Sequence, residues 1–218
     1  MLTVSLGGKA RGPERILCLG AHADDIEIGC SGTVFRMLAE HSNVAVTWVV
    51  MGCDELRAQE ALESAHAVLG AAGRKTIVIK AFRDGFFPTQ AAQIKECFEE
   101  LKAEVSPDVV FTHYRNDLHQ DHRLMAELTW NTFRDHLILE YEIPKYDGDL
   151  GNPNVFVHLD QALCQRKVAN ILTSFRSQKE KRWFTEDLFL ALLRLRGMEC
   201  NSPSGHAEAF YCRKVVLG

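Results

Sequence analysis

The sequence lacks any long hydrophobic run, because none of its apolar stretches approaches the roughly 18 residues of a membrane-spanning helix. Positive charge is also scarce. The chain has 25 Lys and Arg against 29 Asp and Glu, a net charge of −4, which excludes a domain-scale basic surface for nucleic acid or an anionic membrane. The first 15 residues carry Lys9 and Arg11 but no apolar segment, so we expect no signal peptide.

The seven cysteines are odd in number and scattered, with neither a CxxC pair nor a disulfide-like spacing. We therefore expect reduced thiols and a cytoplasmic protein. Cys30 alone lies near the chemistry described below, and we interpret it as a packing residue because no base is paired with it in the sequence. No linker and no internal repeat divides the chain, so 218 residues suit a single domain.

The chain does contain a regular alternation of apolar runs and amphipathic stretches. Strands are predicted at 15–20, 44–51, 76–80 and 108–113, and helices at 29–40, 54–69 and 88–105. This alternation predicts an α/β fold with a mostly parallel sheet and helices on both of its faces.

After about residue 135 the pattern changes. Strands are predicted at 136–143, 155–159 and 207–216, and helices at 161–175 and 186–197. We expect one domain over 1–218, in which a core, 1–135, carries the chemistry and a continuation, 136–218, walls in the site. The loop 147–154 and the segment 175–183 are expected to shape that wall.

Two polar motifs follow the first and the fourth predicted strand: AHADDIEIGC at 21–30 and HQDH at 119–122. Both should lie at the same rim of the sheet, because ligands of parallel sheets bind beyond the carboxyl ends of the strands. His22, Asp25 and His122 form a two-histidine, one-carboxylate set. Such a set suits zinc, and also iron(II) or another divalent metal, and leaves a position open for water.

The neighbouring residues supply acid–base groups. Asp24 is placed to take a proton from a metal-activated water, and His119, as an imidazolium, to stabilise an oxyanion or protonate a leaving amine. Asp121 is a candidate to orient one of the histidines, and Asp117 either does likewise or caps the helix that follows. Iron oxygenases use the same ligand types, so these alone leave the reaction open.

The stretch AHADDIEIGCSGT resembles the AHPDDxExGxGGT signature of the N-acetylglucosaminyl deacetylases, the family of PIG-L and LmbE-like proteins. RNDLHQDH is similar to that family's second motif, and AEAF at 207–210 to a C-terminal element common in it. Ala23 and Ser31 stand where the signature has Pro and Gly.

The resemblance implies a Rossmann-like, zinc-dependent de-N-acetylase. In it His22, Asp25 and His122 match the metal ligands, Asp24 the general base, and His119 the oxyanion stabiliser or acid. Oligomers are usual for the family, so a homo-oligomer is expected.

Two residues are candidate substrate contacts. Arg57 lies after the second strand, where relatives often carry an arginine for a phosphate or hydroxyls, and His206 precedes the AEAF element. The expected function is removal of acetyl from a small N-acetylglucosamine-like sugar conjugate, with no nucleic-acid partner and no integral membrane segment. Hydrolysis of another amide or thiol-sugar conjugate and non-catalytic sugar binding are the alternatives.

Three further residues have weaker expectations. Glu27 either anchors the first loop or takes part in the site. Glu208 either faces the site or pairs with an arginine. His113 is interpreted as a packing or surface residue.

Overall fold

A single seven-stranded sheet organises the molecule. The computed structural model describes residues 13–41 and 43–216, so most of the first 15 residues, for which no signal peptide is expected, lie outside it. The strands are β1 (Arg15–His22), β2 (Ala45–Gly52), β3 (Arg74–Ile79), β4 (Val109–His113), β5 (Leu137–Tyr141), β6 (Val155–His158) and β7 (Ala207–Tyr211). Their order is β3-β2-β1-β4-β5-β7-β6. The first five are parallel, and β7 is antiparallel to β5 and β6.

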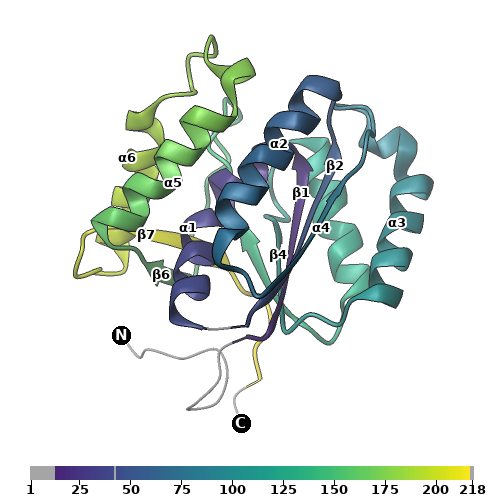
Figure 1. Ribbon diagram of the computed structural model, residues 1–218, viewed down its shortest axis with the longest axis horizontal. Helices are drawn as coiled ribbons and strands as arrows, with labels where there is room; N and C mark the ends of the chain where they lie inside the picture. Colours follow the sequence, from purple (N-terminus) through teal and green to yellow (C-terminus); the bar gives the residue numbers. More distant parts are fainter. Residues whose placement is uncertain (1–12, 42, 217–218) are drawn as a thin grey trace.

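Helices cover both faces of this sheet (Figure 1). They are α1 (Asp25–Glu40), α2 (Glu55–Val68), α3 (Ala91–Glu104), α4 (Gln120–Thr132), α5 (Gln161–Ser174) and α6 (Glu186–Glu199). Along β1, Ile16 and Cys18 pack in one apolar cluster with α1, α2 and α5, while Leu17 and Leu19 pack in another with α3 and α4. A strand buried on both faces must be apolar throughout, as β1 is. The predicted α/β fold is thus confirmed.

Three element boundaries differ from the expected ones. Helix α1 begins at Asp25, not at Gly29, so the first motif itself forms the first helical turn. Helix α4, predicted only as the helix after Asp117, runs over thirteen residues. Strand β7 ends at Tyr211, not at residue 216, because the last residue of β7 paired with β6 is Phe210.

Strand β7 grips helix α1. The amides of Gly32 and Thr33, inside α1, donate to the Glu208 carboxylate at 2.9 and 2.6 Å. Lys167 of α5 donates to Ile28 O at 2.6 Å and forms a buried ion pair with Glu208. The expectation that Glu208 faces the site or pairs with an arginine was therefore wrong, because a buried lysine from α5 reaches it instead.

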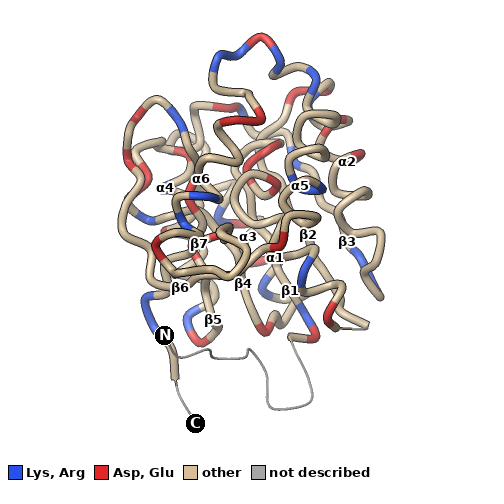
Figure 2. Tube along the Cα trace, turned by 90° about the vertical axis from the view of Figure 1, so that its left-hand side faces the viewer, with Lys and Arg blue, Asp and Glu red and all other residues tan. Residues whose placement is uncertain are grey.

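Charges of both signs alternate over the outer helices and loops, and the side seen in Figure 2 has no face of one sign. Within the described part of the chain, no helix is long and apolar enough to cross a membrane.

Candidate metal centre

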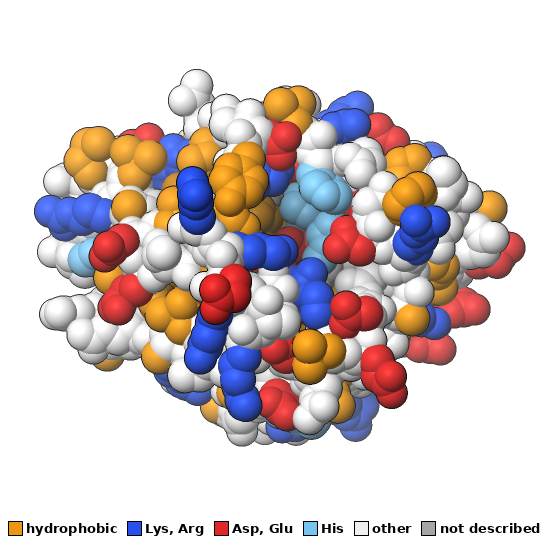
Figure 3. Space-filling model, turned by 90° about the horizontal axis from the view of Figure 1, so that it is seen from above, with side chains coloured by type: hydrophobic (Ala, Val, Ile, Leu, Met, Phe, Trp, Pro, Cys, Tyr) orange, Lys and Arg blue, Asp and Glu red, His pale blue; other side chains and the backbone are white. Residues whose placement is uncertain are grey.

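The two motifs meet at the carboxyl end of the sheet. His22 ends β1, Asp25 begins α1, and His122 lies in the first turn of α4, which follows β4. Seen from above, this end of the molecule carries a group of histidine side chains at its centre, with acidic, basic and hydrophobic side chains around them (Figure 3). The structure thus brings together residues that are about 100 positions apart in the sequence.

The donor atoms of the three candidate ligands converge on one point. His22 Nδ1 lies 3.2 Å from His122 Nε2 and 3.3 Å from Asp25 Oδ2, and His122 Nε2 lies 3.5 Å from Asp25 Oδ1. Donors that are each about 2.0–2.1 Å from a tetrahedral zinc lie about 3.3–3.4 Å apart. The three side chains therefore fit one face of a zinc tetrahedron and leave its fourth corner open.

Each of the two histidines meets a carboxylate at its other nitrogen. His22 Nε2 lies 3.2 Å from Asp121 and 3.1 Å from Asp84, while His122 Nδ1 lies 2.9 Å from Asp117. Metal-bound histidines characteristically donate their second ring N–H in this way, which fixes the tautomer and the ring orientation. The arrangement directs one lone pair of each ring to the same point.

The local field at that point favours a positive charge. Burial opposes protonation of His22, but Asp25, Asp121 and Asp84 outweigh it and raise the pKa of His22 well above its usual range. Burial likewise opposes ionisation of Asp25, yet the surrounding histidines hold the pKa of that carboxyl well below its usual range. A divalent cation would take the place of the proton that these groups share.

Asp24 is held by an arginine. Arg57 Nη2, from the first turn of α2, donates to Asp24 Oδ1 at 2.7 Å, and both side chains are largely buried. Arg57, expected to bind substrate, thus contacts the candidate general base. Asp54 caps α2 by accepting from the Arg57 amide at 2.8 Å, which sets the direction from which the arginine enters.

His119 is the N-cap of α4. Its Nδ1 accepts a hydrogen bond from the Asp121 amide at 3.3 Å, which requires that Nδ1 carry no proton. Burial, followed by the neighbouring His122 and His22, lowers the pKa of His119. A ring nitrogen of each of these three histidines lies within 4.8 Å of the others. His119 is thus arranged as a neutral imidazole, not as the expected imidazolium.

Asp121 anchors the loop that follows β3. Its carboxylate accepts from the amides of Gly85 at 2.7 Å and Phe87 at 3.1 Å, and it is fully buried. Gly85 has φ +78°, a conformation that favours glycine. This turn brings Asp84, whose side chain is 61% exposed, to His22. Asp121 therefore orients His22 and positions the loop, and its side chain does not reach the fourth corner of the site directly.

Sequence reasoning did not assign His113 to this site. It is fully buried at the end of β4, its Nε2 accepts from the Ala21 amide at 2.9 Å, and its ring stacks on His122 with 3.9 Å between centroids. Its Nε2 also lies 3.2 Å from Asp25 Oδ2. The available signal was its place at the end of the strand that carries the second motif.

The structure does not bring His206 to this cluster. His206 lies in the turn before β7, where its Nδ1 is 3.1 Å from Ser204 O and its carbonyl accepts from the Leu159 amide. Within 13–41 and 43–216, no recorded contact joins it to the histidines of the site.

A family model matches residues 17–133, more than half of the chain; its description is PIG-L, GlcNAc-PI de-N-acetylase. The match covers both motifs and the first five elements between them.

Solved structures share the fold over nearly the whole chain. N,N'-diacetylchitobiose deacetylase from Pyrococcus horikoshii is 23% identical, with 92% of this chain and 84% of that one covered and a TM-score of 0.70. A zinc-inhibited form of the teicoplanin deacetylase Orf2 is 13% identical (91% and 97% covered, TM-score 0.68). The 4-carboxy-2-hydroxymuconate hydratase GalB from Pseudomonas putida KT2440 is 14% identical (94% and 98% covered, TM-score 0.71). The fold therefore occurs with more than one chemistry.

Proposed function

The chain belongs to the PIG-L family of GlcNAc-PI de-N-acetylases, and on that premise we propose that it removes the N-acetyl group of an N-acetylglucosamine-like sugar conjugate by metal-assisted hydrolysis. The observation that carries the proposal is the convergence of His22, Asp25 and His122 on one point, with a carboxylate behind each histidine. Asp24 and His119 lie beside that point with the proton acceptor and the donor that amide hydrolysis needs.

His22, Asp25 and His122 would hold the metal, for which zinc suits the donor set and spacing best. Bound there, the ion would lower the pKa of a water and polarise the acetyl carbonyl. The open corner and the position among strand ends leave room for a ligand to approach from the surface.

Asp24 acts as the general base. It takes the proton of the attacking water while the water oxygen bonds to the acetyl carbon, and it then passes that proton to the amide nitrogen as the C–N bond breaks. The products are acetate and the free amine. Arg57 keeps the Asp24 carboxylate ionised and fixed in direction, which makes it a positioning residue in this scheme.

His119 stabilises the oxyanion as a neutral donor. Because its Nδ1 is occupied by the Asp121 amide, the proton of the ring is on Nε2 and is available to the tetrahedral oxygen. A neutral imidazole is a poor general acid, so in this scheme the leaving amine receives its proton from Asp24 and not from His119.

Hydrolysis of another amide or of a thiol-sugar conjugate on the same site is the first alternative, since the motif residues do not contact the acyl or aglycone groups directly. Sugar binding without catalysis is the second, and it leaves the Asp24–Arg57 pair beside the metal position without a use. The two differ in whether any amine is released.

Acetate release from a panel of N-acetylglucosamine conjugates tests the proposal, with wild type and Asp24→Asn compared after loading with zinc and after chelation. We expect release by zinc-loaded wild type only, with Asp24→Asn slower by about 10²–10⁴-fold. Asp24→Asn should still bind one zinc per chain. Equal turnover by the two proteins would refute the role of Asp24, and release that persists after chelation would refute the metal.

A further inference from the structure

A cavity of about 430 Å³ lies between the loop after β5 and the connection from α5 to α6. Its lining is mostly apolar: Pro144, Tyr146, Leu150, Trp183 and Leu188. In Figure 1 the connection between α5 and α6 rises at the same end of the molecule to which the β1 arrow points. The cavity therefore opens on the face that carries the metal centre.

Direct contacts join this cavity to the site. Lys145, in its wall, lies 2.8 Å from the same oxygen of Asp117 that contacts His122 Nδ1 at 2.9 Å. The carboxylate of Asp149 accepts from the Leu118 amide at 2.7 Å, which ties the cavity loop to the residue before His119. One carboxylate thus separates the cavity wall from a candidate metal ligand.

The charges of the wall are unbalanced. Lys145 is neutralised by Asp117 and Asp149. Arg182 also lines the cavity, and in the described part of the chain no hydrogen bond or ion pair of its side chain is recorded. No carboxylate lines the cavity, so Arg182 is its one uncompensated charge. Tyr146 adds an aromatic surface that is 81% exposed.

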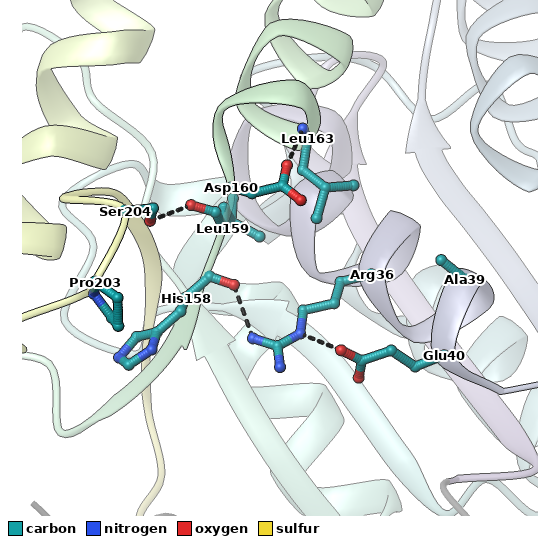
Figure 4. Close-up of a pocket in the computed structure, with 9 residues that line it drawn as sticks. All are labelled: Arg36, Ala39, Glu40, His158, Leu159, Asp160, Leu163, Pro203 and Ser204. Carbon is teal, nitrogen blue, oxygen red and sulfur yellow. Dashed lines mark hydrogen bonds and ion pairs between the residues drawn. The ribbon is translucent and has the colours of Figure 1, made fainter.

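A second cavity, of about 450 Å³, has the opposite character. It lies at the far end of α1, about 16 Å along the helix from Asp25. Its Arg36 is held by Glu40 at 2.7 Å and by His158 O at 2.8 Å, and its Asp160 caps α5 (Figure 4). These charged groups have partners within the protein, so that cavity offers no charge to a ligand.

We propose that the cavity of Tyr146, Leu150, Trp183 and Arg182 is a subsite for the aglycone of the substrate, and that it takes an apolar aglycone bearing an anionic group. This inference rests on the proposed function, because it places the sugar at the metal centre. The apolar part of the aglycone packs against Tyr146, Leu150 and Trp183, and its anion pairs with Arg182. A carboxylate and a phosphate satisfy the same chemistry.

The test uses methyl, octyl and 7-carboxyheptyl glycosides of N-acetylglucosamine, as both anomers, with kcat/KM for acetate release by the zinc-loaded enzyme. We expect octyl to exceed methyl by about tenfold or more, since several methylene groups leave water. The carboxylate should add a further gain of about threefold to tenfold.

Three variants separate the two contributions. Arg182→Gln should abolish the gain from the carboxylate and keep the gain from the alkyl chain, and Tyr146→Ser should reduce the alkyl gain. Arg74→Gln is the matched control, because this exposed arginine begins β3 at the opposite end of the sheet. It should change neither gain.

Equal kcat/KM for all three glycosides would overturn the subsite while leaving the deacetylase intact. If no glycoside released acetate, the proposed function would fail, and calorimetry with the corresponding glucosamine glycosides would still decide the subsite. Tighter binding of the carboxyheptyl compound, lost in Arg182→Gln, supports it; equal affinities overturn it. Retention of the carboxylate gain in Arg182→Gln would remove the arginine from the proposal.

Discussion

Asp117 holds His122 from the side that faces away from the metal position. Replacing it with Asn removes the anion that orients the ring, and losses of about 10- to 100-fold in metal affinity accompany such changes. We expect Asp117→Asn to weaken zinc binding by that factor in a chelator competition.

The matched control is Asp149→Asn. Asp149 shares Lys145 with Asp117 but has no recorded contact with a candidate ligand among the described residues. Its replacement should leave zinc affinity within about twofold. If both variants bound zinc as wild type does, the orienting role of Asp117 would be wrong.

Arg57 is expected to act through Asp24. A hydrogen bond to a charged group contributes about 1.5–3 kcal/mol, so losing it should lower kcat by about 10- to 100-fold. We expect Arg57→Met to lower kcat with little change in KM, and Arg57→Lys to restore part of the rate. A rise in KM at constant kcat would instead favour the substrate-binding role that the sequence suggested.

Glu27 is fully buried, and burial raises its pKa to about 8. Its folded pKa exceeds its unfolded value, so the folded state binds the extra proton, and stability should fall as pH rises from about 4.5 to 8. The fall is up to about 4 kcal/mol in metal-free protein. Urea unfolding should find this slope reduced in Glu27→Gln; an unchanged slope would assign it to other groups.

Among the elements, helix α1 depends on close packing at Gly29. A Cβ there would lie 2.2 Å from the Tyr141 ring, which is fully buried and donates to Leu19 O at 2.7 Å. We expect Gly29→Ala to destabilise by about 3 kcal/mol, against the usual gain of Ala over Gly in a helix.

Gly70→Ala is the comparison, since nothing lies within 4 Å of its Cβ position. It should be neutral or slightly stabilising. Thermal unfolding of both variants measures the difference, and a Gly29→Ala protein as stable as wild type would contradict the packing argument.

The strands that lie buried between two helical layers could be predicted from the sequence, because each must be apolar throughout. The start of α1 could not, because Asp24, Asp25 and Glu27 look like a polar loop until a metal position and a buried carboxyl are known. The end of β7 could not either, since it depends on the length of its partner β6.

For the site, the paired motifs placed six residues at one rim of the sheet, which the geometry matches in position. His113 and Asp84 escaped because their neighbours in the sequence are ordinary strand and turn residues. Their roles arise from contacts with His122 and His22 across the fold. The partner of Arg57 was missed for the same reason, since Asp24 is 33 positions away.

At the scale of the whole molecule, the continuation 136–218 is expected to be indispensable for the core 1–135. It supplies Tyr141 against Gly29 and the Lys167–Glu208 pair against α1, along with β5, β7 and two helices. A protein ending at residue 135 should therefore show no cooperative thermal transition, although it holds both motifs. A sharp transition, with zinc bound, would define 1–135 as an autonomous domain.

The grip of Glu208 on helix α1 also sets an order in time. Both motifs leave the ribosome by residue 122, but the carboxylate that takes up the Gly32 and Thr33 amides is synthesised 86 residues later. A nascent chain thus displays all its metal donors long before it can hold them in place. Zinc capture during translation would be loose and exchangeable, and we expect the ion to become firmly retained only once β7 has been inserted beside β5.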